Sequence, residues 1–205
     1  MGELQSANIV KINATFEDAP LVIENLKCGA GATAVYEIAI EGKASVASLG
    51  NINRALCTLQ KESPAVKIAL DLSAAIWYEY SFEWCFGDVA NLVAIVFPKV
   101  SAIVCNLKHC AGLESAVFMQ GLESIGCAVF DDCRKLKSVS LPESLEIVND
   151  CAFMDCPSLQ TVFYGGSKAQ WEQLAVTNID CCNEHLLEAK IICQDGVFKE
   201  RSATD

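Results

Sequence analysis

Hydrophobic residues in the second half of the chain recur at a fixed interval. Leu113, Leu136 and Leu159 lie 23 residues apart, and Cys133 and Cys156 keep the same interval. Each leucine is followed two positions later by Ser or Thr and then by apolar residues in partial alternation, which predicts a brief β-strand. A fixed period of this length predicts a solenoid whose repeats stack as successive rungs, with the three leucines in register.

The copies of the repeat differ in how closely they follow the pattern. The clearest copy runs from Leu136 to Cys156, and the copy from Leu113 to Cys133 is next. A degenerate copy runs from Leu92 to Cys110, and a faint echo runs from Leu70 to Cys85. Because no single repeat can bury its apolar side alone, all of them are expected to form one continuous array.

Three residue types have predicted places within each rung. Pro142 should end its strand, since proline cannot donate to a strand ladder. Phe130 and Phe153 are expected to fill the middle of the coil. The column of equivalent cysteines, including Cys133 and Cys156, is expected to be packed and reduced, because free cysteine behaves in a core as a small hydrophobe.

The regions on either side of the array lack the repeat. Ser45 to Lys61 predicts a helix capped by Ser45, between strands at Val35–Ile40 and Val66–Leu72, so the two strands should pair in parallel. Ile9–Ile12 and Leu21–Leu26 predict a further strand and a second short element. Beyond the array the pattern predicts a helix at Ser167–Leu174, a last strand at Glu188–Cys193 and a frayed tail at Lys199–Asp205. The chain is therefore predicted to be an α/β solenoid with an N-terminal α/β capping region (1–65), the array (66–164) and a C-terminal cap with tail (165–205).

The clearest copy also carries a family resemblance. Leu141-Pro142-Glu143-Ser144-Leu145-x-x-Val148, followed by Ala152-Phe153-x-x-Cys156-x-Ser158-Leu159, resembles the leucine-rich repeats of the BspA type. Tyr164-Gly165-Gly166-Ser167-x-x-x-Trp171 is similar to the segment that often closes such arrays, and the resemblance covers about Leu92 to Ile192. It implies a right-handed leucine-rich-repeat solenoid with a parallel sheet of short strands. It also implies a bacterial or protist surface or secreted protein that binds host proteins or other cells.

If Leu136, Val139 and Leu141 point inward, their neighbours form an exposed sheet face. One column of that face is more apolar than a solvated sheet requires, and an exposed apolar column often marks an interface. Either a partner or a second copy of the chain would bind there, or the cap covers the column, or the register is shifted by one residue and the faces are exchanged. The residues predicted to contact a partner are Val93, Val96, Glu114, Val117, Lys137, Ser140, Gln160 and Phe163.

Composition narrows the function further. With 52% hydrophobic and 20% charged residues, the chain of 205 residues has material for a core and does not belong to the disordered class. A net charge of −11 disfavours binding to nucleic acid, because phosphate contacts need clustered Lys and Arg. The longest apolar region, Val89 to Leu107, is interrupted by Pro98 and Lys99 and predicts no membrane span. Met1 to Ser6 shows no signal peptide, and twelve cysteines at largely repeating positions would fit a reducing compartment, so location stays open.

Candidate chemistry is sparse. Two clusters could supply zinc ligands, namely Cys105 with His109 and Cys110, and Cys181 with Cys182 and His185. A cysteine beside either histidine could also form a thiolate pair for catalysis. Against this, no Cys-x-x-Cys pair exists and Cys110 belongs to the repeat column. The sequence therefore predicts no enzyme, no metal and no cofactor. The aromatic residues Trp77, Tyr78, Tyr80 and Trp84 are expected to fill the core at the junction of cap and array, with a ligand platform as the alternative.

Overall fold

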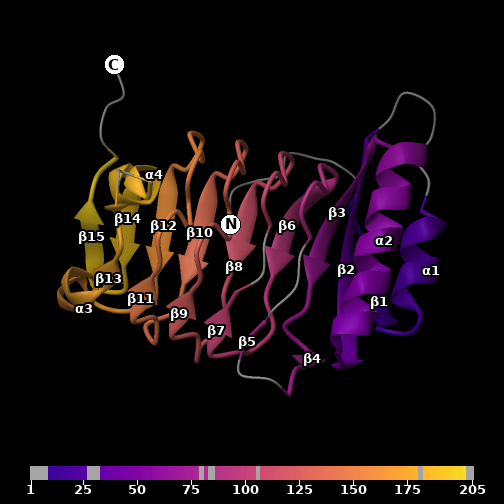
Figure 1. Cartoon of the computed structure of the whole chain (residues 1–205), viewed down its shortest axis with the longest axis horizontal. Coiled ribbons are helices and arrows are strands. Elements are labelled where there is room, and N and C mark those ends of the chain that lie inside the picture. The colour runs from indigo at the N-terminus through magenta and orange to yellow at the C-terminus, as the bar shows by residue number, and fades with distance from the viewer. Residues whose placement is uncertain are drawn as a thin grey trace.

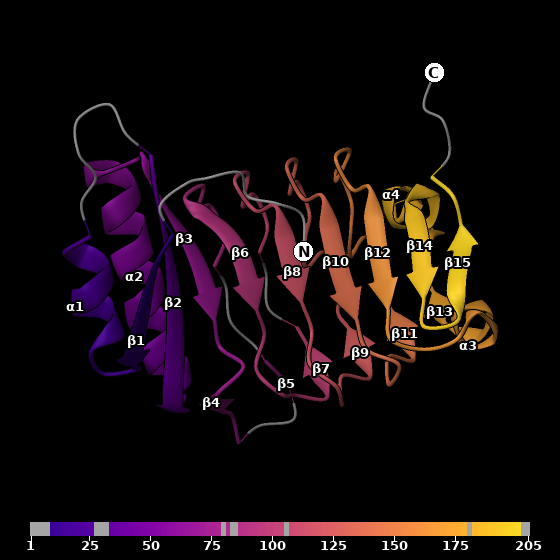
Figure 2. The same ribbon diagram turned by 180° about the vertical axis from the view of Figure 1, so that it is seen from behind.

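The structure is a computed structural model that describes residues 9–26, 33–78, 81–82, 86–104, 107–179 and 182–201. Its main sheet runs the length of the molecule, and a second sheet of two-residue strands lies beside it (Figures 1 and 2). The main sheet has the order β1 (Ile9–Thr15), β2 (Ala34–Lys43), β3 (Val66–Asp71), β6 (Leu92–Val96), β8 (Ser115–Val117), β10 (Ser138–Leu141), β12 (Thr161–Tyr164), β14 (Lys190–Cys193) and β15 (Gly196–Lys199). The second has the order β13 (Ala175–Val176), β11 (Ile147–Val148), β9 (Ser124–Ile125), β7 (Ala102–Ile103) and β5 (Ser81–Phe82), and β4 (Ala75–Ile76) pairs with β2.

The predicted solenoid is confirmed, and its rungs advance by one repeat at a time. Ser138 pairs with Ser115 on one side and with Thr161 on the other, so the residues that follow the three repeat leucines share one register. The leucines themselves, Leu113, Leu136 and Leu159, are all buried. The degenerate copy joins in the same way, because β6 pairs with β8 through Ala94 and Ser115. Each rung from β6 to β12 contributes one strand to the main sheet and one to the second sheet.

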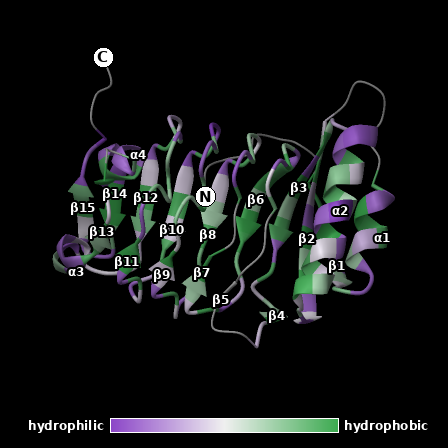
Figure 3. Ribbon diagram, in the orientation of Figure 1, coloured by the Kyte–Doolittle hydropathy of each residue, from purple (hydrophilic) through white to green (hydrophobic). Residues whose placement is uncertain are grey.

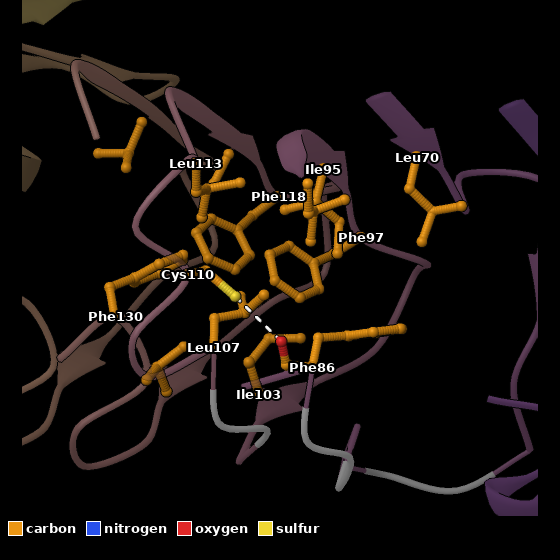
Figure 4. Packing of buried hydrophobic residues seen from close by; sticks show 14 of the residues in the cluster. Leu70, Phe86, Ile95, Phe97, Ile103, Leu107, Cys110, Leu113, Phe118 and Phe130 are labelled. Carbon is orange, nitrogen blue, oxygen red and sulfur yellow. Dashed lines mark hydrogen bonds between the residues drawn. The ribbon is translucent and has the colours of Figure 1, made fainter. Parts of the chain in front are cut away.

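Aromatic rings fill the interior between the two sheets. Phe130 and Phe153 are fully buried, and their ring centroids lie 5.0 Å apart in a stacked pair. Phe97 and Phe118 stack at 4.6 Å, and Phe118 meets Phe130 edge-on at 5.9 Å (Figure 4). The four rings thus link successive rungs, and aromatic pairs of this kind add about 0.5–1.5 kcal/mol each beyond the area they bury.

A ladder of buried cysteines runs beside the rings, as the spacing predicted. The Cys110 thiol donates to the carbonyl oxygen of Phe86 at 3.0 Å (Figure 4), and the Cys133 thiol donates to that of Leu107 at 3.2 Å. The Cys156 thiol donates to the carbonyl oxygen of Phe130 at 3.1 Å. Each of the three thiols therefore satisfies a backbone carbonyl of the preceding rung while it packs as a small apolar group.

The N-terminal part of the sheet is covered on one side by two helices (Figure 1). Helix α2 (Val46–Glu62) begins where predicted, since the Ser45 hydroxyl accepts a hydrogen bond from the Ser48 backbone N–H and the Ser48 hydroxyl accepts one from the Ser45 backbone N–H. Its buried stripe includes Leu49, Ile52 and Leu56. Helix α1 (Ala19–Glu24) packs against α2. Since β2 and β3 belong to the same sheet as the array, the proposed boundary at residue 65 remains a prediction.

The C-terminal end agrees with the prediction in part. Helix α3 (Lys168–Gln173) is capped by Ser167, and Trp171 packs edge-on against Tyr164 at 5.3 Å. The prediction of β14 as the last strand was wrong, because β15 follows and pairs with it antiparallel. Gly196 at the turn has φ +119°, which glycine tolerates and which permits the tight reversal. Helix α4 (Glu184–Glu188) ends on the first residue of the predicted strand, and β14 begins at Lys190.

Candidate protein-binding face

The main sheet has an inner and an outer face because its side chains alternate. Ile95, Ala116, Val139 and Val162 point into the core and are at most 1% exposed. Their neighbours on the same strands are partly exposed, so they form the outer face of the array. Figure 2 looks onto this face, with α1 and α2 on the far side of the sheet.

One column of the outer face joins four of the residues predicted to contact a partner. Val96 pairs with Val117, Val117 with Ser140, and Ser140 with Phe163. The register on which this prediction depended is therefore the one observed. Phe163 is 40% exposed, a high value for a large aromatic side chain in a sheet.

The apolar column extends into the C-terminal cap. Phe163 pairs with Ile192 of β14, and Ile192 in turn pairs with Val197 of β15, which is 41% exposed. Sequence reasoning missed Ile192 because it lies beyond the repeat. The alternation of buried Ile191 and buried Cys193 around it is the signal that could have found it.

The other four predicted contact residues lie together where the strands begin. Backbone hydrogen bonds connect them in order, from Glu114 N–H to the Val93 carbonyl, from Lys137 N–H to the Glu114 carbonyl, and from Gln160 N–H to the Lys137 carbonyl. The Lys137 ammonium lies 2.7 Å from a Glu114 carboxylate oxygen. Most of this ion pair is open to solvent, so it adds little to stability. Between this column and the apolar one lies a row of small side chains, Ala94, Ser115, Ser138 and Thr161.

Hydropathy changes along the array. Strand β6 is hydrophobic throughout, whereas β10 and β12 mix polar and apolar residues (Figure 3). The hydropathy of the outer face therefore changes from strand to strand. The face is apolar near β6, carries serines in the middle and has Phe163 on β12.

Comparison with known families agrees with this architecture. Residues 105–202 match the family model described as BspA type leucine-rich repeat region, in six copies. This part of the chain is therefore similar to BspA-type leucine-rich repeats. The rung that contains β6 precedes the matched residues, yet it pairs in the same manner as the rungs within them. No curated protein and no solved structure matches the chain. Leucine-rich repeats of this family indicate a protein-interaction module, since a solenoid presents an extended surface to its partners.

Two members of the first candidate metal cluster lie in different environments. Cys110 is buried in the cysteine ladder, whereas the His109 side chain is about half exposed. His109 Nδ1 lies 3.0 Å from an Asp132 carboxylate oxygen, and the Arg134 guanidinium lies 2.6 Å from the other oxygen. The hydrogen bonds with His109 and Arg134 lower the pKa of Asp132. Cys105, the remaining member of the predicted cluster, lies outside the described residues.

The second candidate cluster is divided as well. Cys182 meets Asp150 and Cys151 rather than His185, which lies on α4. Cys181 is not among the described residues.

The aromatic residues at the junction take two different environments. Trp77 is partly buried and packs against the core, as predicted. Tyr78 is 69% exposed, and the Lys43 ammonium lies 5.8 Å from the centre of its ring. Tyr80 and Trp84 lie outside the described residues, so the choice between core filling and a ligand platform stays open for them.

Within the described residues, no helix is both long enough and apolar enough to cross a bilayer.

Proposed function

We propose that this chain is a non-catalytic module that binds a protein partner through the outer face of its main sheet. The observation that carries the proposal is the apolar column Val96, Val117, Ser140 and Phe163, which is in register and ends in a 40% exposed phenylalanine. Aromatic residues of this kind are the usual anchors of interfaces, where they desolvate a large area at low entropic cost. The polar column of Glu114, Lys137 and Gln160 would form the rim.

The face suits a folded protein or an extended peptide better than a small ligand. Small molecules bind in concave pockets that bury most of their surface, whereas this face is built from strands with small side chains along its middle row. Lys137 is exposed on it and Glu114 is partly exposed, so it offers both signs of charge to a polar rim.

The test compares two lysine substitutions in the full chain. Phe163→Lys places a charge on the aromatic anchor of the proposed interface. The control Val104→Lys changes another exposed apolar residue. Val104 is 53% exposed and follows β7 of the second sheet. A partner is first captured from cells that produce the protein and is then purified, and its affinity for each variant is measured directly.

We expect Phe163→Lys to weaken binding by about tenfold or more, which is 1.4 kcal/mol or more. Val104→Lys should leave the affinity unchanged. Equal affinities for the two variants would show that the partner binds elsewhere.

Self-association is the alternative, in which the column pairs with that of a second copy. Light scattering distinguishes the two, because a stable dimer that Phe163→Lys dissociates would favour a structural role over binding of a separate partner. The family resemblance further suggests adhesion at a cell surface. Protease treatment of intact cells tests that extension, since a surface protein is degraded while an internal one is protected.

A further inference from the structure

Three side chains with metal-binding atoms converge where the last rung meets the C-terminal cap. Asp150 and Cys151 belong to the turn after β11, and Cys182 lies just before α4. One carboxylate oxygen and the two sulfurs all lie within 4.8 Å of one another. The Cys182 sulfur is 2.8 Å from Asp150 Oδ1, and it also accepts a hydrogen bond from the Cys151 backbone N–H at 2.9 Å.

A fully buried asparagine holds the two segments together. The Asn183 amide nitrogen donates to the carbonyl oxygens of Asn149 at 2.9 Å and Thr177 at 2.6 Å. Its amide oxygen accepts from the Phe153 backbone N–H at 2.9 Å. Because these bonds lie on both sides of the cluster in sequence, Cys182 is positioned by the fold and not by a freely moving loop.

The two thiols have no part in the repeat itself. The turn one rung earlier carries Cys127 and Ala128 at the positions of Asp150 and Cys151. Ala128 and Cys151 have nearly the same left-handed backbone, with φ 55° and 54°. An alanine therefore satisfies this turn, and the Cys151 thiol is additional to what the fold requires. Unlike the cysteine ladder, Cys151 and Cys182 are also partly exposed, so an ion can reach them.

We propose that Cys151, Cys182 and Asp150 bind one zinc ion that joins the last rung to the C-terminal cap. Zinc prefers four ligands drawn from thiolate, imidazole and carboxylate, so two sulfurs, one carboxylate oxygen and a water would complete its shell. On binding, each thiol loses its proton to solvent and its sulfur forms a bond to the ion, with release of two protons in total. The Cys151 N–H would then stabilise the Cys182 thiolate, as outer-shell hydrogen bonds do in other thiolate sites.

A disulfide between the same two sulfurs is the competing arrangement. It would use both thiols but give no role to the carboxylate, whose oxygen lies 2.8 Å from Cys182. Three residues each place a metal-binding atom in this cluster, whereas a disulfide would use only two of them. The arrangement therefore favours a bound ion over a disulfide.

The experiment uses the full chain, treated with a chelator and kept in a non-thiol reductant. Zinc content is measured after equilibration with zinc chloride, and cobalt(II) is titrated as a spectroscopic substitute that gives a sulfur-to-metal charge-transfer band. We expect one zinc per chain and a cobalt band that is lost in Cys151→Ala. This substitution reproduces the turn of the preceding rung, so the fold should be kept. Asp150→Asn should weaken the affinity for zinc by about tenfold or more.

Cys127→Ser is the matched control, because it removes an exposed thiol at the equivalent place of the preceding rung. It should bind zinc as the unmodified chain does, and zinc should raise the unfolding midpoint of both but not that of Cys151→Ala. The proposal is overturned if the unmodified chain binds no stoichiometric zinc or if Cys151→Ala binds it equally. It is also overturned if a Cys151–Cys182 disulfide persists in the reductant.

Discussion

The buried thiol of Cys156 should make the stability of the array depend on pH in the alkaline range. Cys156 is fully buried, and its burial raises the pKa of the thiol from the ordinary value of 9.0 to about 12. The unfolded chain therefore releases this proton above pH 9.0, while the folded chain keeps it. Because the unfolded state then binds fewer protons, the free energy of unfolding falls as the pH rises from 9.0 toward 12.

The size of the effect follows from the two pKa values. About one unit above pH 9.0, the unfolded thiol is roughly ten parts thiolate to one part thiol, whereas the folded thiol remains protonated. The unfolded state gains about 1.4 kcal/mol from this ionisation. Burial raises the pKa of Cys133 in the same way, so the two ladder thiols together should lower the free energy of unfolding by about 3 kcal/mol. That is a large part of the 5–15 kcal/mol typical of a domain.

Serine substitution isolates the contribution of one thiol. In Cys156→Ser the hydroxyl can still donate to the Phe130 carbonyl, but it does not ionise in this range. Urea unfolding in a non-thiol reductant, at about pH 7 and about pH 10, gives the loss of stability for each chain. We expect Cys156→Ser to lose about 1.4 kcal/mol less than the unmodified chain. The reasoning is refuted if both lose the same amount, since the thiol would then ionise as readily in the folded state as in the unfolded one.

Three further substitutions test the packing and the caps. Phe153→Ala should lower the free energy of unfolding by about 4 kcal/mol, because a fully buried ring and its stacking partner are lost; a urea midpoint that implies less than about 2 kcal/mol would contradict the stacked interior. Ser45→Ala should cost about 1 kcal/mol by removing the cap of α2, measured by thermal unfolding, and no change would mean that the capping box is not formed. Asn183→Ala leaves the Phe153 N–H and the Thr177 carbonyl without these partners, at about 1–3 kcal/mol for each group, whereas the Asn149 carbonyl keeps its hydrogen bond from the Ala152 N–H. Hydrogen exchange at the Phe153 amide should become faster, and unchanged exchange would place its bond elsewhere.

Much of the array could be predicted because its interior repeats. A shift of one residue would move Val139 to the solvent and Ser140 into the core, so the alternation in Ser138–Leu141 allows one register only. The caps of α2 and α3 were predictable for a similar local reason, since Ser45 and Ser167 each receive a hydrogen bond from a residue three positions on.

The features that could not be predicted depend on contacts between distant residues, which leave no local pattern in the sequence. The strands of the second sheet, such as β9 and β11, are two residues long and too short to show a period. Helix α4 and the Cys182 cluster lie where Asn183 bonds to residues about thirty positions away in sequence. Strand β15 requires a chain reversal at Gly196. That reversal follows β14, which the sequence pattern predicted as the last strand.

The division of the main sheet into an inner and an outer face should allow the proposed partner binding and the stability of the chain to be changed separately. Inner columns repeat leucine, phenylalanine and cysteine because each must fill the same space in every rung. The outer column at the strand starts has a different residue on every rung, namely Val93, Glu114, Lys137 and Gln160. Substitution of a partly exposed outer residue removes little buried surface and is expected to cost within about 0.5 kcal/mol. A loss of partner binding in Phe163→Lys, with an unchanged urea midpoint, would therefore report on the interface itself and not on unfolding of the array.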